Sequence, residues 1–499
     1  MRDRIAPLFV LSLIVLGTIP TGGAATTVED GSSSVIPDDE SAPISAQSHI
    51  EAGPLSHASS GSNRIHSAIS SGQLHARSVA TSGDGEIVRT MTLALTPDRA
   101  GTIDVTLSFD IPETVVDLTT SIPEDATVTA TTGFSRDGSG NYTWDGETPS
   151  PSLTVSLPAN ETGAYHYERI RNRQKNLDRG ETSTQGLVFA DTGPWAIVDI
   201  PNLYTAWTYR GRPQPTLRRE VRVAGSGHAG TAIAYLGPNE AYSKTVGEQR
   251  ITLVVPEAAE LKPSRNELFE SLRAAADRLR VAGTPDRSVL IAAPTDVDWG
   301  PYGLAERPDA WVRADRPLDS PNNVWLHEYV HLRQNFTTAT SARWVLEATG
   351  EYYATYLTLV QGRIGFQTFQ DHLEEGERSR FASSILTQPD TWVRLADYKK
   401  GGLVYGTLDR RIRLATGSRH TAAALFRAMN HRGEPVTNRF LRETVTSLAG
   451  AETARYFTSA TTTTGTPTMW TRGEHLEAFS TLPPQMLSTV SDRFRISGP

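Results

Sequence analysis

The chain has 499 residues, too many for one ordinary core, and its 38% hydrophobic and 21% charged residues are typical of a soluble globular protein with two or three domains. The absence of cysteine excludes disulfides, a thiol nucleophile and any cysteine-ligated metal. The formal net charge of −8 is a mild acidic excess, which argues against a nucleic-acid partner.

Residues 1–25 have the three parts of a secretory signal. Basic residues precede an apolar run at 5–19, and small residues follow it. The run is short for a membrane span, which needs about twenty residues. We therefore expect cleavage near Ala24 or Ala25 and a secreted or extracytoplasmic protein, with retention at the cell surface by an uncleaved segment as the alternative. No stable membrane span is expected beyond this segment.

The next segment, residues 26–85, is rich in serine, glycine and histidine and has little hydrophobic periodicity. This composition predicts a disordered linker. Four histidines recur in it at intervals of eight or nine residues: His49, His57, His66 and His75. Because no second type of ligand accompanies them, we interpret them as solvated linker residues and not as a metal site.

Residues 86–258 show the alternation of β-strands. Ile103, Val105, Leu107 and Phe109 point one way, while threonine, serine and aspartate point the other. Further strands are expected at residues 87–95, 126–131, 153–157, 187–190, 217–223 and 250–255, with proline and glycine between them. The pattern predicts an antiparallel β-sandwich-like domain.

A domain of mixed structure is predicted at residues 259–417. Ser264 and Glu267 form a capping box, and apolar residues follow at helical spacing. Short strands at 288–293 and 310–314 then lead towards a further helix. The overall class is therefore α+β, with a mixed domain after the β-domain.

The further helix carries His327-Glu328-Tyr329-Val330-His331, an H-E-x-x-H motif. Two imidazoles four residues apart project from one helix face and can reach one metal ion, while Glu328 lies beside that metal without binding it. Ser320 and Pro321 are the expected N-cap and first helical residue. The motif predicts a zinc peptidase. The alternative is a pair of histidines hydrogen-bonded at the edge of the core.

A second helix contains Trp344-Val345-Leu346-Glu347, with Glu347 sixteen residues after His331. The two segments together resemble the gluzincin metallopeptidases, in which H-E-x-x-H is followed by a W-x-x-E-G-x-A-E-Y-like helix. The resemblance implies a thermolysin-like catalytic domain, one Zn²⁺ ion and Glu347 as its third ligand. Glu351 is a competitor for that position; otherwise it would accept a proton from a ligating imidazole. Ala348 and Gly350 stand where the family usually has glycine and alanine.

A third segment, Tyr398-Lys399-Lys400-Gly401, resembles the Y-x-K-G helix start of the aminopeptidase N and glycyl aminopeptidase groups. This resemblance implies that Tyr398 stabilises the oxyanion, with Tyr405 as an alternative donor. Glu306, in Tyr302-Gly303-Leu304-Ala305-Glu306, could bind a substrate amine, although we interpret it as a loop residue.

Residues 418–499 are predicted to be a helical C-terminal part, with helices at 421–430, 438–448 and 451–459. The expected function is hydrolysis of peptides or proteins by water that zinc activates and Glu328 deprotonates. An aminopeptidase is favoured by the tyrosine motif. The alternatives are an endopeptidase of the same fold and a non-catalytic surface binding protein. The sequence leaves the oligomeric state open.

Overall fold

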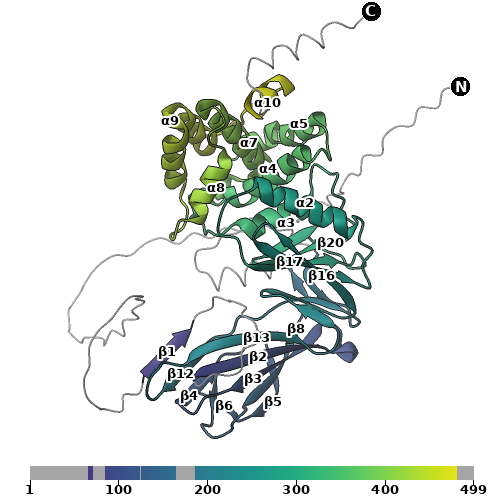
Figure 1. The fold of residues 1–499 in the computed structure, drawn as a ribbon, viewed down its shortest axis with the longest axis vertical. Helices are drawn as coiled ribbons and strands as arrows, with labels where there is room; N and C mark the ends of the chain where they lie inside the picture. Colours follow the sequence, from purple (N-terminus) through teal and green to yellow (C-terminus); the bar gives the residue numbers. More distant parts are fainter. Residues whose placement is uncertain (1–65, 71–84, 124, 164–185, 480–499) are drawn as a thin grey trace, which may run out of the picture. The chain divides into compact units, whose positions relative to one another are not determined.

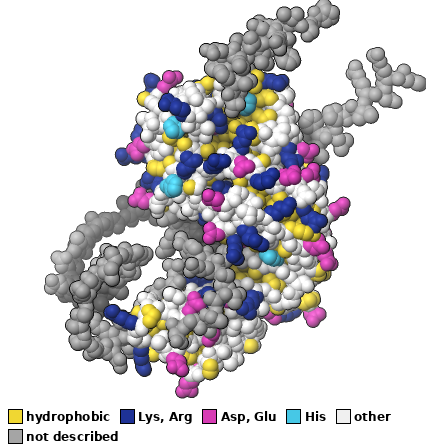
Figure 2. Space-filling model, viewed as in Figure 1, with side chains coloured by type: hydrophobic (Ala, Val, Ile, Leu, Met, Phe, Trp, Pro, Cys, Tyr) yellow, Lys and Arg dark blue, Asp and Glu magenta, His cyan; other side chains and the backbone are white. Residues whose placement is uncertain are grey.

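The computed structural model of the chain describes residues 66–70, 85–123, 125–163 and 186–479. The predicted signal segment, most of the predicted linker and the last twenty residues of the predicted helical part lie outside these ranges. Within the described ranges, no helix has both the length and the hydropathy that crossing a bilayer requires. On the face drawn in Figure 2, basic and acidic side chains are interspersed over the described surface.

Two five-stranded sheets pack face to face as the predicted β-sandwich (Figure 1). The first sheet contains, in spatial order, β13 (Thr216–Val223), β2 (Glu86–Leu95), β3 (Thr102–Asp110), β8 (Ser152–Pro158) and β5 (Thr127–Thr132). The second contains β1 (His66–Ser70), β12 (Thr205–Tyr209), β4 (Val115–Thr120), β7 (Tyr142–Trp144) and β6 (Phe134–Arg136). Every second residue of β3 is buried from Ile103 to Phe109, because successive side chains of a strand face opposite sides.

Two features of the sandwich differ from the prediction. β1 lies inside the range predicted as a linker and pairs with β12, although its sequence His-Ser-Ala-Ile-Ser has no clear alternation. β13 runs parallel to β2, so the sandwich is not wholly antiparallel. Hydrophobic alternation depends only on which face of a strand is buried, and it carries no information about the direction of the neighbouring strand.

Two further sheets follow. One contains β14 (Gly227–Ala229), β15 (Ile233–Leu236), β11 (Ala196–Asp199), β10 (Leu187–Asp191) and β9 (Glu161–Thr162). The other is mixed and contains β16 (Asn239–Val246), β17 (Gln249–Pro256), β18 (Arg287–Ala293), β20 (Asp309–Arg313) and β19 (Gly303–Glu306). β17 and β18 run parallel, as do β18 and β20. β16 and β17 thus belong with the mixed domain, whereas the prediction put them in the β-rich domain.

The mixed sheet is buried on both faces. Leu290 and Ala292 of β18 belong to the core shared with the helices, whereas Val289 and Ile291 belong to the core shared with β10, β11 and β15. This burial explains the nearly continuous apolar run of β18, which is typical of a parallel strand covered on both sides.

The helices pack on the mixed sheet and on one another (Figure 1). They are α2 (Arg265–Arg278), α3 (Val324–Arg333), α4 (Val345–Val360), α5 (Phe366–Glu374), α6 (Ser379–Ala382), α7 (Ala396–Thr416), α8 (Ala422–Asn430), α9 (Asn438–Thr462) and α10 (Arg472–Phe479). The predicted capping box of α2 is present. The two helices predicted at 438–459 are one run, α9, kinked at Gly450. On α7, Gly401 and Gly402 contact Ala348 and Glu351, so the absence of side chains lets α7 approach α4 closely.

Asp309 joins the mixed sheet to the neighbouring sheet. Its carboxylate is 1% exposed and accepts backbone N–H groups of Thr231 (2.5 Å), Ala232 (2.7 Å) and Val289 (2.8 Å). In Asp309→Asn, an NH₂ group replaces one of these oxygens and leaves at least one buried N–H without an acceptor. We expect the free energy of unfolding to fall by about 1–3 kcal/mol, measured by urea unfolding followed by tryptophan fluorescence.

The control for this change is Asp104→Asn. Asp104 pairs with Arg99 at 2.8 Å on the surface, so its replacement should change the free energy of unfolding by less than about 0.5 kcal/mol. Equal destabilisation by the two substitutions would contradict the role given to Asp309.

Candidate metal centre

Helix α3 carries the H-E-x-x-H residues and begins after a buried asparagine. The side-chain oxygen of Asn323 accepts the N–H of Leu326 at 3.2 Å, and its amide donates to the hydroxyl of Thr358 on α4 at 3.1 Å. The N-cap predicted at Ser320 with Pro321 is therefore wrong, since both residues lie in the bend before the helix. Asn323 is the better cap because it satisfies a helix-end N–H and also ties α3 to α4.

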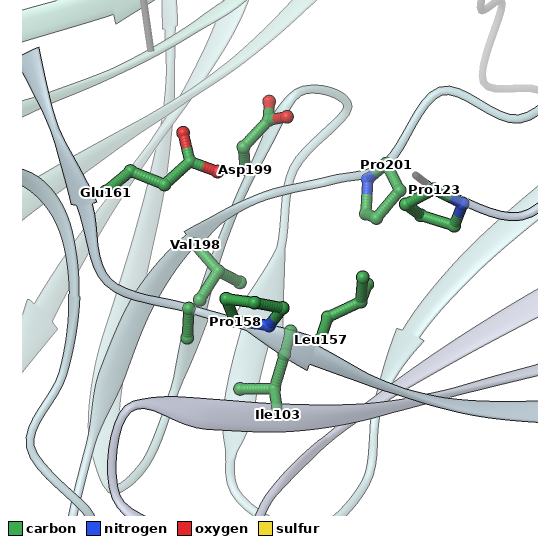
Figure 3. A pocket seen from close by; sticks show the side chains of 9 residues that line it. Ile103, Pro123, Leu157, Pro158, Glu161, Val198, Asp199 and Pro201 are labelled. Atoms are coloured by element: carbon green, nitrogen blue, oxygen red, sulfur yellow. The ribbon is translucent and has the colours of Figure 1, made fainter. Parts of the chain in front are cut away.

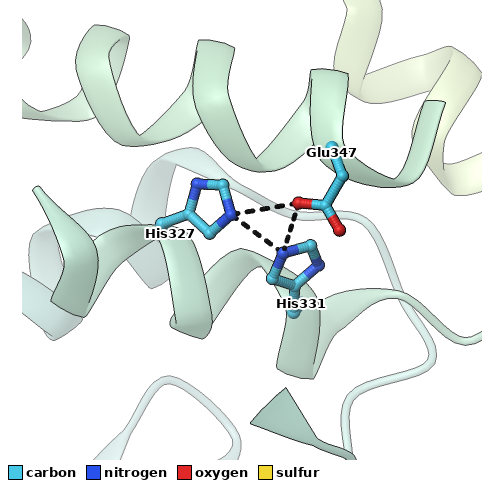
Figure 4. Close-up of side chains that lie close together, drawn as sticks. All are labelled: His327, His331 and Glu347. Carbon is cyan, nitrogen blue, oxygen red and sulfur yellow. Dashed lines mark hydrogen bonds and ion pairs between the residues drawn. The ribbon is translucent and has the colours of Figure 1, made fainter. Parts of the chain in front are cut away.

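His327 and His331 lie one turn apart on α3 and face the same space, which Glu347 enters from α4 (Figure 4). The two Nε2 atoms are 3.0 Å apart, and Oε2 of Glu347 is 3.3 Å from each of them. Among the described residues, these three form the one group of histidine and carboxylate side chains close enough to hold a metal ion, with ligand atoms within 4.8 Å of one another.

The geometry of this group fits a zinc ion. Tetrahedral zinc with bonds of about 2.0–2.1 Å places neighbouring ligand atoms roughly 3.3 Å apart, close to the three separations observed. Two imidazole nitrogens and one carboxylate oxygen are donors that zinc prefers. Three protein ligands leave a fourth position for water or substrate, as in catalytic zinc sites.

Without a metal ion, the same group holds a proton. Burial opposes the charge on His331, but the carboxylates of Glu347 and Glu328 raise the pKa of this histidine to about 9. Burial likewise opposes ionisation of Glu347, but His331 and His327 hold its pKa well below the usual range. A divalent cation held by these residues would have to displace a proton from His331, so its affinity would rise as the pH rises towards 9.

Glu328 lies beside the group and outside it. Its side chain is 6% exposed and contacts strand β19 at Gly303, where an added Cβ would lie 2.7 Å from Oε1 of Glu328. A side chain at position 303 would displace Glu328 from this place, so Gly303 lets β19 lie against the Glu328 side chain. The carboxylate of Glu328 thus lies next to the three ligand atoms without belonging to their group.

Tyr398 lies in the first turn of α7 and reaches the group from that helix. Its ring stacks on that of His327, with centroids 5.7 Å apart and planes 3° from parallel. Burial and the carboxylates of Glu347 and Asp397 raise the pKa of Tyr398 well above 10, so its hydroxyl remains a donor at neutral pH. The alternative donor Tyr405 lies elsewhere, fully buried, with its hydroxyl donating to a backbone carbonyl of α8 at 3.2 Å.

Glu351 does not have the contacts predicted for it. Its Oε1 lies 2.8 Å from Nζ of Lys399 and 2.8 Å from Nε2 of His372. Although burial opposes ionisation, Lys399 and His372 hold the pKa of Glu351 below its usual range. Nδ1 of His327 is buried and has no hydrogen-bond partner among the described residues, so Glu351 does not accept its proton. Neither role predicted for Glu351 is found; it anchors α7 to α4.

Gln334 contacts the site and was missed in the sequence. It follows the last residue of α3, and its Oε1 lies 3.0 Å from Nδ1 of His331. Residues three apart on a helix are neighbours, and this spacing is the signal that could have identified Gln334. Many side chains satisfy that spacing by chance. The other partners of Gln334, Leu346 and Thr349, lie on α4, and the sequence alone does not show that α4 packs there.

The sequence predicts that Glu306 lies in a loop. This prediction is wrong, because Glu306 is the last residue of strand β19. It pairs in register with Asp309 across the turn to β20. Gly303, which contacts Glu328, is three residues away, so Glu306 lies about 10 Å further along the strand at roughly 3.3 Å per residue. The other possibility considered from the sequence, that Glu306 binds a substrate amine, is not tested by these contacts.

A pocket in the β-rich part shares no residue with this centre (Figure 3). The carboxylates of Glu161 and Asp199 lie at one side of it, and its other lining residues are aliphatic or proline: Ile103, Pro123, Leu157, Pro158, Ala159, Val198 and Pro201. This lining contains no histidine and none of the three residues of the candidate metal group.

No protein-family model and no curated protein matches the sequence. Among solved structures, the chain is similar to an M1 zinc metallopeptidase from Deinococcus radiodurans, with a TM-score of 0.47 and 14% identity over 77% of this chain and 95% of that one. It is also similar to an aminopeptidase N family protein from Idiomarina loihiensis, with a TM-score of 0.48 and 12% identity over 76% of each chain. These two neighbours are of the group that the sequence motifs resemble.

Proposed function

We propose that this protein is a zinc-dependent peptidase of the gluzincin type, which hydrolyses peptide bonds at the group formed by His327, His331 and Glu347. The observation that carries the proposal is the convergence of these three ligand atoms at separations of 3.0 and 3.3 Å. The position of Glu328 next to them, against β19, supports a hydrolytic function over metal storage or a purely structural site. Export from the cell, based on residues 1–25, is part of the proposal.

The roles of the side chains follow from their positions. When bound, zinc lowers the pKa of a water molecule to about 7 and polarises the peptide carbonyl. The Glu328 carboxylate takes a proton from the attacking water and later delivers it to the departing amine. The hydroxyl of Tyr398 donates to the carbonyl oxygen as that oxygen becomes negative. The water oxygen thus adds to the carbonyl carbon, and the C–N bond breaks.

An aminopeptidase is the favoured form of this activity. The support comes from Tyr398, which matches the aminopeptidase N motif and stacks on His327. An aminopeptidase also needs a group that binds the free amine of the substrate, and Glu306 on β19 is our candidate. An endopeptidase would not need such a carboxylate.

The test combines metal analysis with product analysis. We expect the purified protein to contain one zinc ion per chain and to lose activity when a chelator removes it. On a short peptide offered with a free or an acetylated amino end, we expect release of the first residue from the free peptide and no cleavage of the blocked one. Internal cleavage of both peptides would show an endopeptidase, and a protein that binds no zinc would contradict the proposal.

A further inference from the structure

We infer that Gln334 is a positioning residue that fixes the proton of His331 on Nδ1 and so directs the lone pair of Nε2 towards the metal. This inference rests on the proposed zinc function and extends it to a residue outside the H-E-x-x-H motif. Gln334 is 9% exposed and has three hydrogen-bond contacts, one to His331 on α3 and two to α4.

The contacts to α4 determine how the amide of Gln334 is oriented. Its Nε2 lies 2.8 Å from the backbone oxygen of Leu346 and 2.8 Å from the hydroxyl of Thr349. A backbone oxygen only accepts, so the NH₂ group must face it. The Thr349 hydroxyl donates to the same Leu346 oxygen at 3.1 Å, which leaves its lone pairs for the amide. The reversed amide would place two acceptors against each other.

The orientation of the amide then determines the tautomer of His331. The oxygen of Gln334 lies 3.0 Å from Nδ1 and can only accept, so Nδ1 carries the hydrogen. In a neutral imidazole the other nitrogen is then the acceptor, and Nε2 is the atom that faces Glu347 and His327. Gln334 thus disfavours the tautomer that would put a hydrogen where the metal binds.

Gln334 also links His331 to α4, the helix that carries Glu347, because its amide donates to Leu346, the residue directly before Glu347. Gln334 forms no such link for His327. Within the part of the chain that the structure describes, Nδ1 of His327 lacks a hydrogen-bond partner, and the ring is held by packing between Gly350 and Tyr398. Loss of Gln334 should therefore act on His331 and on its distance from Glu347, and leave His327 in place.

The experiment compares Gln334→Met with a matched substitution, Gln361→Met, in the full chain. Gln361 also joins two helices by paired amide contacts, since it accepts from the hydroxyl and donates to the carbonyl of Ser271. It lies at the end of α4, outside the metal group. Both variants lose an interhelical amide, but only Gln334→Met should weaken zinc binding, by about 10- to 100-fold, measured by competition with a chromogenic chelator.

A second measurement reports on the proton itself. In the zinc-loaded protein labelled with ¹⁵N-histidine, the Nδ1 proton of His331 should exchange slowly with water, and its exchange should be faster in Gln334→Met. Zinc affinity in Gln334→Met within threefold of the wild type would overturn the inference, and so would an equal loss in both variants. A wild-type chain that binds no zinc would instead contradict the proposed function, whatever the behaviour of Gln334→Met.

Discussion

Glu328→Gln is expected to lower kcat for peptide hydrolysis by about 10²- to 10⁴-fold and to leave zinc binding intact. The glutamine amide has the shape of the carboxylate and fits under β19 at Gly303, but it cannot take a proton from water. Glu328 is outside the group of three ligand atoms, so the metal should remain bound. The measurements are the steady-state rate on a free peptide and the zinc content of the same sample.

The control is Glu443→Gln, which removes a carboxylate of the same kind from the exposed side of α9, where Glu443 pairs with Arg439 at 2.8 Å. Its kcat should equal that of the wild type. If Glu328→Gln retained full activity, Glu328 would not be the general base. If it lost zinc, Glu328 would belong to the ligand set.

The helices of the site could be predicted from the sequence because their signals are local. The spacing of His327 and His331 is one helical turn, and any α-helix that contains it places the two imidazoles on one face. The capping box of α2 is equally local. The N-cap of α3 was misplaced because Ser320 with Pro321 and Asn323 are both acceptable caps; burial of Asn323 against Thr358, a residue distant in sequence, decides between them.

The contacts around the ligands could not be predicted because each depends on which elements pack together. Glu351 lies one turn from Glu347, a spacing that suggests a contact with the histidines, but the close approach of α7 brings Lys399 to it instead. The same limit applies to β16 and β17. The sequence predicts a strand at 250–255 and none over β16, and the assignment of both strands to the mixed sheet depends on the pairing of β17 with β18.

Gly350→Ala is expected to weaken zinc binding and to lower kcat/KM by about 10²-fold without loss of the fold. An added Cβ would lie 2.8 Å from Cε1 and 3.0 Å from Nε2 of His327, closer than such atoms can approach. Gly350 lies within α4, where alanine favours the helix by about 1 kcal/mol, so the backbone should stay in place. The imidazole must move, and no described residue forms a hydrogen bond with its Nδ1 that would resist displacement.

The resemblance to the gluzincins would place alanine at position 350, so this substitution restores the usual residue of the family and yet should damage the site. Gly473→Ala is the matched control, because Gly473 also lies in a helix, α10. Among the described residues, its added Cβ would meet only the Thr471 hydroxyl, at 3.9 Å. Zinc affinity and thermal unfolding of the metal-free protein should be measured for both variants. Wild-type zinc affinity in Gly350→Ala would mean that the ring of His327 can shift without leaving the metal, and that packing against α4 does not set its position.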